Sequence, residues 1–322
     1  MPAALPVGMK STLKTSLVRS TLLSAVCATS LIACIKQDEA PSEIKRAIPT
    51  ADQVKIKLPQ SANKAVGDVA EWYVATRNVT RTFNGGAGWV LVLVHTIVQF
   101  PVTSVNGDTY TWGPWSDALD PAEYKLDVTA VGDGTYTYQL SGRSKTQAGS
   151  AFEVIIDGKA DPRPGDLQGN GEFLIDFDAG RRVNPIDAGD AKGQVDVRYD
   201  LAARHLDLGI MSTNEQGEPV MADYAYNETT NGGGDMVFNI DGNAGGTAAQ
   251  EHITLRSRWQ SDGAGRADAR MAGGDLQTGA IASECWDTSF RRTYYTDSVN
   301  FAPTEGSVSA CAFGTVDLPP QH

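Results

Sequence analysis

Histidines are the first residues to consider, because they supply much acid–base chemistry near neutral pH and are frequent zinc ligands. Three precede the C-terminal residue: His95, His205 and His252. The chain has no Gly-x-Ser-x-Gly motif and no HExxH motif, and no histidine stands in a recognisable catalytic or zinc-binding pattern. His205-x-Asp207 would share one strand face, a pairing common on solvated surfaces. The sequence therefore does not predict an enzyme, although a hydrolase site assembled in space stays open.

Aspartates gather in the middle of the chain, and hard cations such as calcium bind carboxylate oxygens. The candidates are Asp157, Asp161, Asp166, Asp176, Asp178, Asp187 and Asp190. Their spacing matches no EF-hand loop, and turn aspartates in an acidic protein are expected to be solvated. The sequence thus predicts no cofactor and no metal site, with calcium as the alternative.

The most distinctive local string is Trp112-Gly113-Pro114-Trp115. Two indoles beside a Gly-Pro turn can stack on a sugar ring or grip a protein partner. Indoles are also often buried, so one or both can fill the mouth of a sheet. Trp112 and Trp115 are therefore candidate ligand-binding residues, and core packing is the alternative.

The N-terminal segment has the order of parts of a secretory leader. Three cationic residues between positions 10 and 19 precede an apolar stretch at residues 22–33. This stretch is shorter than the ~20 apolar residues of a spanning helix and fits the h-region of a signal peptide. It ends in Leu31-Ile32-Ala33-Cys34, which resembles the lipobox of bacterial lipoproteins.

The lipobox resemblance implies that residues 1–33 are a signal peptide and that Cys34 carries the lipid anchor. Ile35 follows it in place of the Asp that retains lipoproteins in the inner membrane, which implies the outer membrane. Removal of the three leader cations would take the net charge from −12 to −15. We expect a protein this acidic to meet an anionic membrane only through its lipid.

Two cysteines remain once Cys27 leaves with the leader and Cys34 is acylated. They are Cys285 and Cys311, and neither belongs to a CxxC motif. In the oxidising compartment that the leader implies, the economical expectation is a structural disulfide between them.

The segments before residue 101 predict a tether and then helices. Residues 34–61 mix charged residues, Pro and Ser without a sustained apolar period, which indicates a flexible tether. Residues 62–83 carry apolar side chains at helical spacing, and the apolar run at 89–100 is long enough for a buried helix. Together they predict an α-hairpin, with His95 as a core histidine.

From Thr109 onward the apolar pattern alternates, which is typical of half-buried strands. Alternating segments lie at residues 110–112, 124–128, 136–140, 152–156, 173–177, 195–199, 205–210, 222–226, 236–240, 253–259, 267–271, 285–295 and 308–313. Gly- and Asn-rich turns separate them, as at Gly132-Asp133-Gly134. The sequence predicts a mainly β fold: a large curved antiparallel meander, half-barrel or open barrel, with the N-terminal α-hairpin packed on it. We expect one domain over residues 62–318.

This plan resembles, in architecture alone, the half-barrel of periplasmic lipoprotein carriers. No motif is shared, so no functional residue is carried over. We expect an outer-membrane lipoprotein that binds an apolar ligand such as a lipid, or serves as an envelope scaffold. The alternatives are a module that binds glycan or protein, and a hydrolase. Nucleic acid is not an expected partner, because the chain is acidic and lacks basic clusters.

Overall fold

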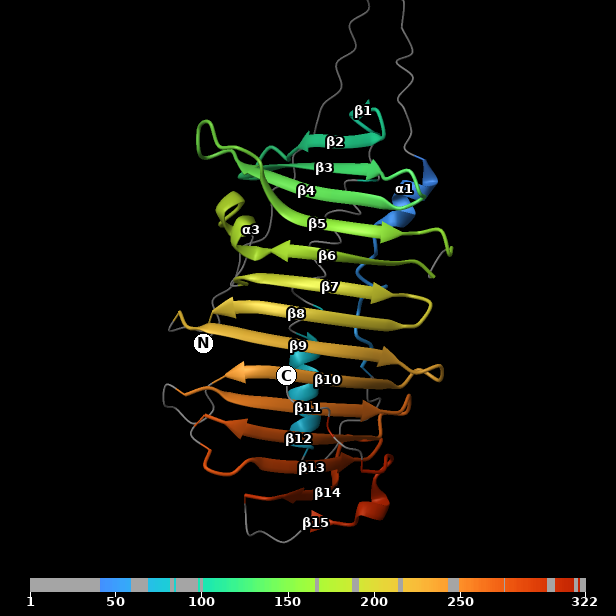
Figure 1. Ribbon diagram of the computed structural model, residues 1–322, viewed down its shortest axis with the longest axis vertical. Coiled ribbons are helices and arrows are strands. Elements are labelled where there is room, and N and C mark those ends of the chain that lie inside the picture. Colours follow the sequence, from blue (N-terminus) through green and yellow to red (C-terminus); the bar gives the residue numbers. More distant parts are fainter. Residues whose placement is uncertain are drawn as a thin grey trace, which may run out of the picture. The chain divides into compact units, whose positions relative to one another are not determined.

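The fold is described from a computed structural model, which covers most of the chain beyond residue 40 (Figure 1). The described residues are 41–58, 69–81, 84, 98 and 101–318, with gaps at 166–167, 187–190, 214–216, 243–248, 275, 300–304 and 316–317. The predicted signal peptide, Cys34, His95 and nearly all of the predicted helix at 89–100 lie outside these ranges.

Fifteen strands form one antiparallel sheet in which each strand pairs with its neighbours in the chain. They are β1 (Ser104–Asn106), β2 (Thr109–Trp115), β3 (Ala122–Ala130), β4 (Tyr136–Ser144), β5 (Glu153–Asp161), β6 (Asn170–Asp176), β7 (Gln194–Asp200), β8 (His205–Thr213), β9 (Pro219–Glu228), β10 (Gly234–Gly242), β11 (Glu251–Trp259), β12 (Gly265–Gly273), β13 (Ala280–Trp286), β14 (Arg292–Asp297) and β15 (Glu305–Gly306). Among the described residues β1 and β15 do not pair, so the sheet is open (Figure 1). The predicted open antiparallel meander is confirmed.

Alternation along each strand gives the sheet two faces. In β3, Ala122, Tyr124, Leu126 and Val128 are buried, and the residues between them are half-exposed. The turn to β4 needs a positive φ at residue 132. Gly132 adopts a φ of +84°, a conformation that glycine tolerates without strain. We call the face that carries Leu126 the inner face and the opposite one the outer face.

The N-terminal part of the described chain covers the inner face. Helix α1 (Ser42–Ala47) and the residues after it bury Ile44, Ile48, Val54 and Ile56, each at most 3% exposed, in the main core cluster. The prediction of a tether reaching residue 61 therefore does not describe residues 41–58. These apolar side chains and that of Ala47, spaced among charged and polar residues, attach this segment to the sheet.

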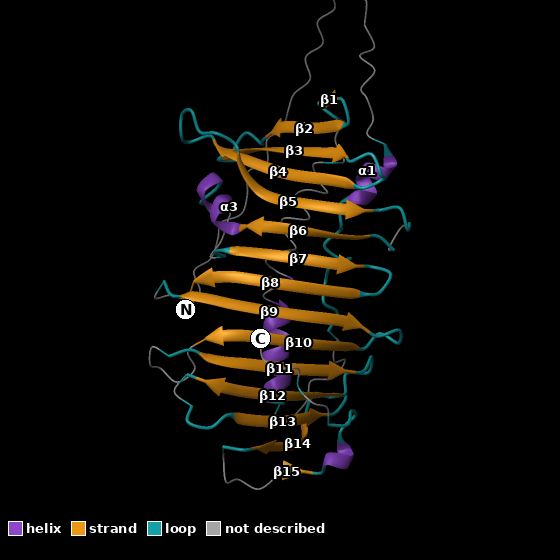
Figure 2. Ribbon diagram, viewed as in Figure 1, coloured by secondary structure: helices purple, strands orange, loops and turns teal. Residues whose placement is uncertain are grey.

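A second helix, at residues 71–81, packs on the inner face (Figure 2). Its Tyr73 ring stacks on Phe290 with centroids 4.2 Å apart, and the hydroxyl of Thr76 donates to Ser257 on β11 at 2.9 Å. This helix falls within the one predicted at 62–83.

The N-terminus of this helix is capped from the sheet by a buried carboxylate. Glu284 on β13 accepts hydrogen bonds from the backbone N–H of Glu71 at 3.1 Å and of Trp72 at 2.6 Å. Arg292 on β14 donates to the same carboxylate at 2.6 Å. The negative charge faces the positive end of the helix dipole, which joins helix and sheet electrostatically.

The strand predicted at 173–177 is confirmed over residues 173–176 as part of β6, and it ends there because α3 (Phe177–Val183) begins after Asp176, whose carboxylate accepts from the backbone N–H of Ala179 at 2.8 Å. Two other local predictions were wrong. The segment predicted at 285–295 is not continuous, because a turn in which the N–H of Phe290 donates to the carbonyl of Asp287 separates β13 from β14. The predicted strand at 308–313 contains instead the short 3-10 helix η1 (Val308–Ala310). No helix in the described ranges is long and apolar enough to cross a bilayer.

Candidate ligand-binding groove

The histidines predicted from the sequence lie at separate places on the outer face. On β8, the two ring nitrogens of His205 lie 2.8 Å from Asn227 Oδ1 and 2.8 Å from Asp207 Oδ2. On β11, Nδ1 of His252 is hydrogen-bonded to the carboxylate of Asp241. These contacts join each ring to a carboxylate or amide oxygen and not to a serine, threonine or cysteine, so they do not form a catalytic triad.

The described aspartates among those considered for calcium do not form one cluster. Asp176 caps α3 and Asp178 lies within it, so these two carboxylates do not share a strand face. Asp161 binds Arg163, and hydrogen bonds from that side chain are the largest cause lowering the pKa of Asp161. Asp166 lies outside the described residues, as do Asp187 and Asp190. Within the described part of the chain, no three His, Cys, Asp or Glu side chains are grouped so that they could hold a metal ion.

The two tryptophans differ in exposure. Trp112 is 1% exposed and belongs to the main core cluster, whereas Trp115 is half-buried. A cis peptide bond between Gly113 and Pro114 separates them. The burial of Trp112 agrees with the core-packing alternative, and ligand binding by Trp115 stays a prediction.

A groove crosses the outer face over β8 to β11. The antiparallel register places Met211 opposite Met221, Met221 opposite Asp241, and Asp241 opposite His252, so these four side chains form one row across the strands. All four line the groove. The methionines are 55% and 56% exposed and are cross-strand partners, so they form one continuous apolar surface on the outer face.

A second row of residues runs alongside the first. It includes Gly209, where the missing side chain leaves the open space that we call the hollow of the groove. The members of this row are Asp196, Gly209, Asp223, Asn239 and Thr254. Gly209 lacks a side chain, and a Cβ placed there would meet no atom nearer than Asp196 Cβ at 4.0 Å. The groove has a volume of about 390 Å³, which lies within the range of small-molecule sites.

Hydrogen-bond acceptors dominate the polar lining. Asp223 accepts from the side-chain amide of Asn239 at 2.9 Å, while Asn239 Oδ1 is buried without a hydrogen-bond partner among the described residues. Asp196 accepts from Arg198 at 2.9 Å. A ligand that donates hydrogen bonds or carries positive charge would satisfy these groups, whereas an anion would be repelled by the carboxylates.

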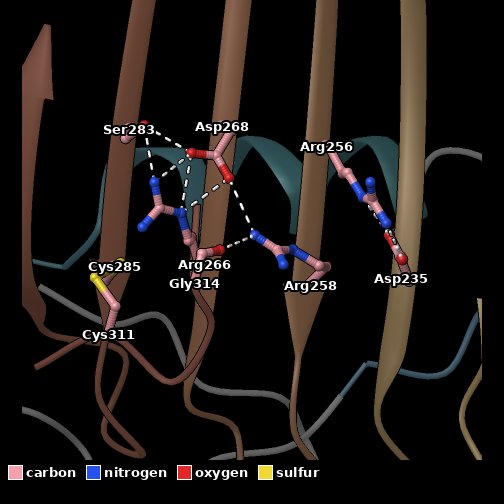
Figure 3. Close-up of polar contacts among 9 residues, drawn as sticks. All are labelled: Asp235, Arg256, Arg258, Arg266, Asp268, Ser283, Cys285, Cys311 and Gly314. Atoms are coloured by element: carbon pink, nitrogen blue, oxygen red, sulfur yellow. Dashed lines mark hydrogen bonds and ion pairs between the residues drawn. A yellow bond between two sulfur atoms is a disulfide. The ribbon is translucent and has the colours of Figure 1, made fainter. Parts of the chain in front are cut away.

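A second polar region on the outer face is covered by the C-terminal segment. Cys285 on β13 and Cys311 form a disulfide with an S–S distance of 2.06 Å, which confirms the predicted pair (Figure 3). Next to it, Arg266 and Arg258 both donate to Asp268, at 2.7 Å and 3.2 Å. Burial lowers the pKa of Arg258, and Asp268 opposes this effect. The guanidinium nevertheless stays charged, because arginine remains protonated in proteins.

Reasoning from the sequence missed the groove. The alternation at 205–210 places Gly209 on the same face as Asp207, so a gap on the wet face could have been read from it. The meeting of Met211 with Met221 depends on the register of the β8–β9 hairpin, which alternation alone does not supply.

Comparison of the chain with protein-family models, with curated proteins and with solved structures finds no match.

Proposed function

We propose that this protein is an outer-membrane lipoprotein, anchored through Cys34, that binds a ligand non-enzymatically in the groove on its outer face. The ligand has an apolar body and a protonated amine or guanidinium head. The observation that carries the proposal is the pairing of two exposed methionines with a row of carboxylate and amide acceptors in one groove.

The two halves of the groove account for the two halves of the ligand. Met211 and Met221 offer flexible, polarizable surface that adapts to an aliphatic chain. Asp223 and Asn239 lie two residues along the strands from that row and accept from a cationic head. The described part of the inner face packs against the chain's own residues 44–56 and the helix at 71–81, which favours the outer groove over the inner face as the place of binding.

Binding is tested with two amphiphiles that share a tail and differ in charge. The Cys34→Ser form is titrated with decylamine and with decanoate by isothermal calorimetry. We expect decylamine to bind and decanoate to bind at least about tenfold more weakly, a difference of about 1.4 kcal/mol. Equal binding of the two would remove the cationic-head part of the proposal.

The place of binding is tested by filling the hollow. Gly209 has a backbone that any residue adopts and open space at Cβ, so Gly209→Val should fold and abolish decylamine binding. Ala225→Val is the matched control, because Ala225 lies on the outer face of β9 opposite Asp207, away from the groove lining. Unchanged binding by Gly209→Val would exclude this groove.

The anchor has its own test. Replacing Cys34 by Ser should move the protein from the membrane fraction to the soluble fraction, because acyl chains contribute about 0.8 kcal/mol for each buried methylene. Native mass spectrometry of that soluble form then asks whether it carries a cellular ligand. An adduct that dissociates on denaturation and has the mass of an amine-bearing amphiphile supports the proposal. An adduct without a basic group contradicts it.

A further inference from the structure

Among the described residues, the region beneath the C-terminal segment holds two buried guanidinium groups and one buried carboxylate. The side chains of Arg258 and Arg266 are 9% and 2% exposed, and both share the carboxylate of Asp268, which is 6% exposed. Asp235, the cross-strand partner of Arg258, is engaged by Arg256 through two hydrogen bonds. A buried charge with only a shared counterion is costly, so the excess of one guanidinium needs an explanation.

Arg258 has a half-used hydrogen-bonding edge. Its Nη2 donates to Asp268 Oδ2 at 3.2 Å and to the carbonyl oxygen of Gly314 at 2.9 Å. Its Nε lies on the same edge of the planar guanidinium and is buried without a hydrogen-bond partner in the described part of the chain. A single carbonyl oxygen serves one of these donors, whereas the two oxygens of a carboxylate or phosphate would serve both.

The Gly314 carbonyl bonded to this edge belongs to the C-terminal segment, which covers Arg258 and which we call the cover. Phe313 lies over the guanidinium of Arg258, 5.1 Å from ring centroid to Cζ, and Gly314 follows it in the chain. The same segment is joined to β13 by the disulfide from Cys311 to Cys285 (Figure 3). Cys285 is the register partner of Arg266, which in turn stands opposite Arg258. The Cys285–Cys311 disulfide, which we call the latch, and the two covered arginines are thus neighbours on adjacent strands.

We propose that Arg258 is a binding site for a phosphate group, that the segment at residues 307–315 keeps it closed, and that reduction of the Cys285–Cys311 disulfide opens it. An external dithiol supplies two electrons and two protons. The S–S bond breaks, both cysteines become thiols, and the dithiol becomes a disulfide. The freed segment withdraws the Gly314 carbonyl and the Phe313 ring, and the phosphate oxygens take Nε and Nη2 of Arg258. Arg266, opposite on the ladder, contributes a second positive charge.

The test measures thermal stability in phosphate and in chloride at equal ionic strength. Phosphate stabilises folded proteins in general as an excluded salt, so the disulfide-bonded protein supplies the baseline difference in Tm between the two salts. The Cys285→Ser/Cys311→Ser form should exceed this baseline difference by about 2–4 °C when phosphate exceeds its Kd about tenfold. Arg258→Gln in that background should remove the excess over the baseline. Arg256→Gln, a change to the neighbouring arginine that Asp235 binds, should leave it intact.

Two further measurements test whether the segment at residues 307–315 opens when the disulfide is broken. Hydrogen exchange at residues 307–313 reports whether the cover leaves the sheet when the latch is broken. If the serine form does not fold, the folded wild-type protein is reduced with dithiothreitol, its free thiols are counted, and exchange and Tm are measured on that sample. A segment that stays protected after reduction overturns the proposal, and so does a freed segment without a phosphate effect.

Vesicles distinguish a lipid headgroup from free phosphate. The reduced Cys34→Ser form is sedimented with vesicles of phosphatidylglycerol in phosphatidylcholine, and Arg258→Gln is the control. Co-sedimentation that depends on Arg258 identifies a phosphate headgroup as the source. A phosphate effect on Tm without co-sedimentation identifies the free ion. Either result supports the binding site.

Discussion

Two ion-pair groups lie on neighbouring strands of the same outer face and differ mainly in what covers them. Arg256 and Asp235 are 26% and 28% exposed and form a two-bond pair at 2.6 and 3.0 Å. Arg266 and Asp268, a strand further along, are 2% and 6% exposed beneath the C-terminal segment. The residue types and distances are similar, so the cover accounts for the difference in desolvation. In the covered group each charge depends on its partner, because water cannot solvate a buried charge whose partner has been removed.

The largest expected effect separates these two groups directly. Asp268→Asn leaves Arg258 and Arg266 buried without a carboxylate, and we expect it to lower the free energy of unfolding by about 3–5 kcal/mol. Asp235→Asn breaks a half-exposed pair and should cost about 0–1 kcal/mol. Urea denaturation of both variants measures the difference. Similar costs would show that the segment does not desolvate the covered group.

The disulfide should stabilise the protein by nearly as much. Cys285 and Cys311 are 26 residues apart, and closing a loop of that length contributes about 3 kcal/mol on the chain-entropy model. In the Cys285→Ser/Cys311→Ser background Asp268→Asn should cost less than in the bonded protein, because the opened segment lets water reach the arginines. A double-mutant cycle measures this coupling. Additive costs would mean that the latch and the arginine cluster are independent.

Much of the sheet could be predicted from the sequence, since alternation is a local property. The pattern at 253–259 gave β11, and the Gly-rich turns gave the hairpin order. Helix α3 was missed, because Phe177 extends the apolar alternation of β6 and only the Asp176 cap marks the change. The cover was missed for a different reason: Val308 and its neighbours also alternate, but a disulfide and contacts with Arg258 hold this segment in a non-strand conformation.

The site depends on the register between strands, which the sequence constrains weakly. Each expected binding residue was chosen for its own chemistry, as Trp112 was, and the structure buries that side chain. The groove instead arises from unremarkable residues, a glycine and two methionines, that cross-strand pairing brings together. The attachment of residues 41–58 was likewise hidden, because their few buried apolar side chains are scattered among charged and polar residues.

A smaller effect on stability is expected on the inner face. There the carboxylate of Glu284 is buried by the helix and the sheet rather than by the C-terminal segment. Its side chain is fully buried, but it accepts from two backbone N–H groups and from Arg292. Glu284→Gln replaces one accepting oxygen by a donor that faces other donors, and should cost about 2 kcal/mol. Glu71→Gln is the control, since Glu71 is 81% exposed and lies 3.6 Å from the same arginine. Thermal and urea unfolding should separate the two variants; equal stabilities would remove the cap from the account of helix packing.

The smallest effect belongs to the uncovered histidine on β8 and depends on pH. Desolvation lowers the pKa of His205, but hydrogen bonds to Asn227 and Asp207, aided by the charge of Asp200, outweigh it and the net shift is upward. A histidine whose pKa is raised in the folded state stabilises the fold below its unfolded pKa of about 6.5, and this contribution disappears as the pH rises through the folded value.

The test of this shift compares unfolding at several pH values. His205→Gln should flatten the decline in stability that the wild-type protein shows above pH ~6.5, by less than about 1 kcal/mol because the ring is 33% exposed. Asp207→Asn removes one of the groups that raise the pKa and should shift the decline to lower pH. An unchanged profile in both variants would mean that Asp207 and Asn227 do not favour the charged ring. Solvent would then screen His205 and Asp207 as strongly as it screens Asp235 and Arg256. The cover over Arg258 and Asp268 would remain the feature that lets an ion pair on this face contribute to stability.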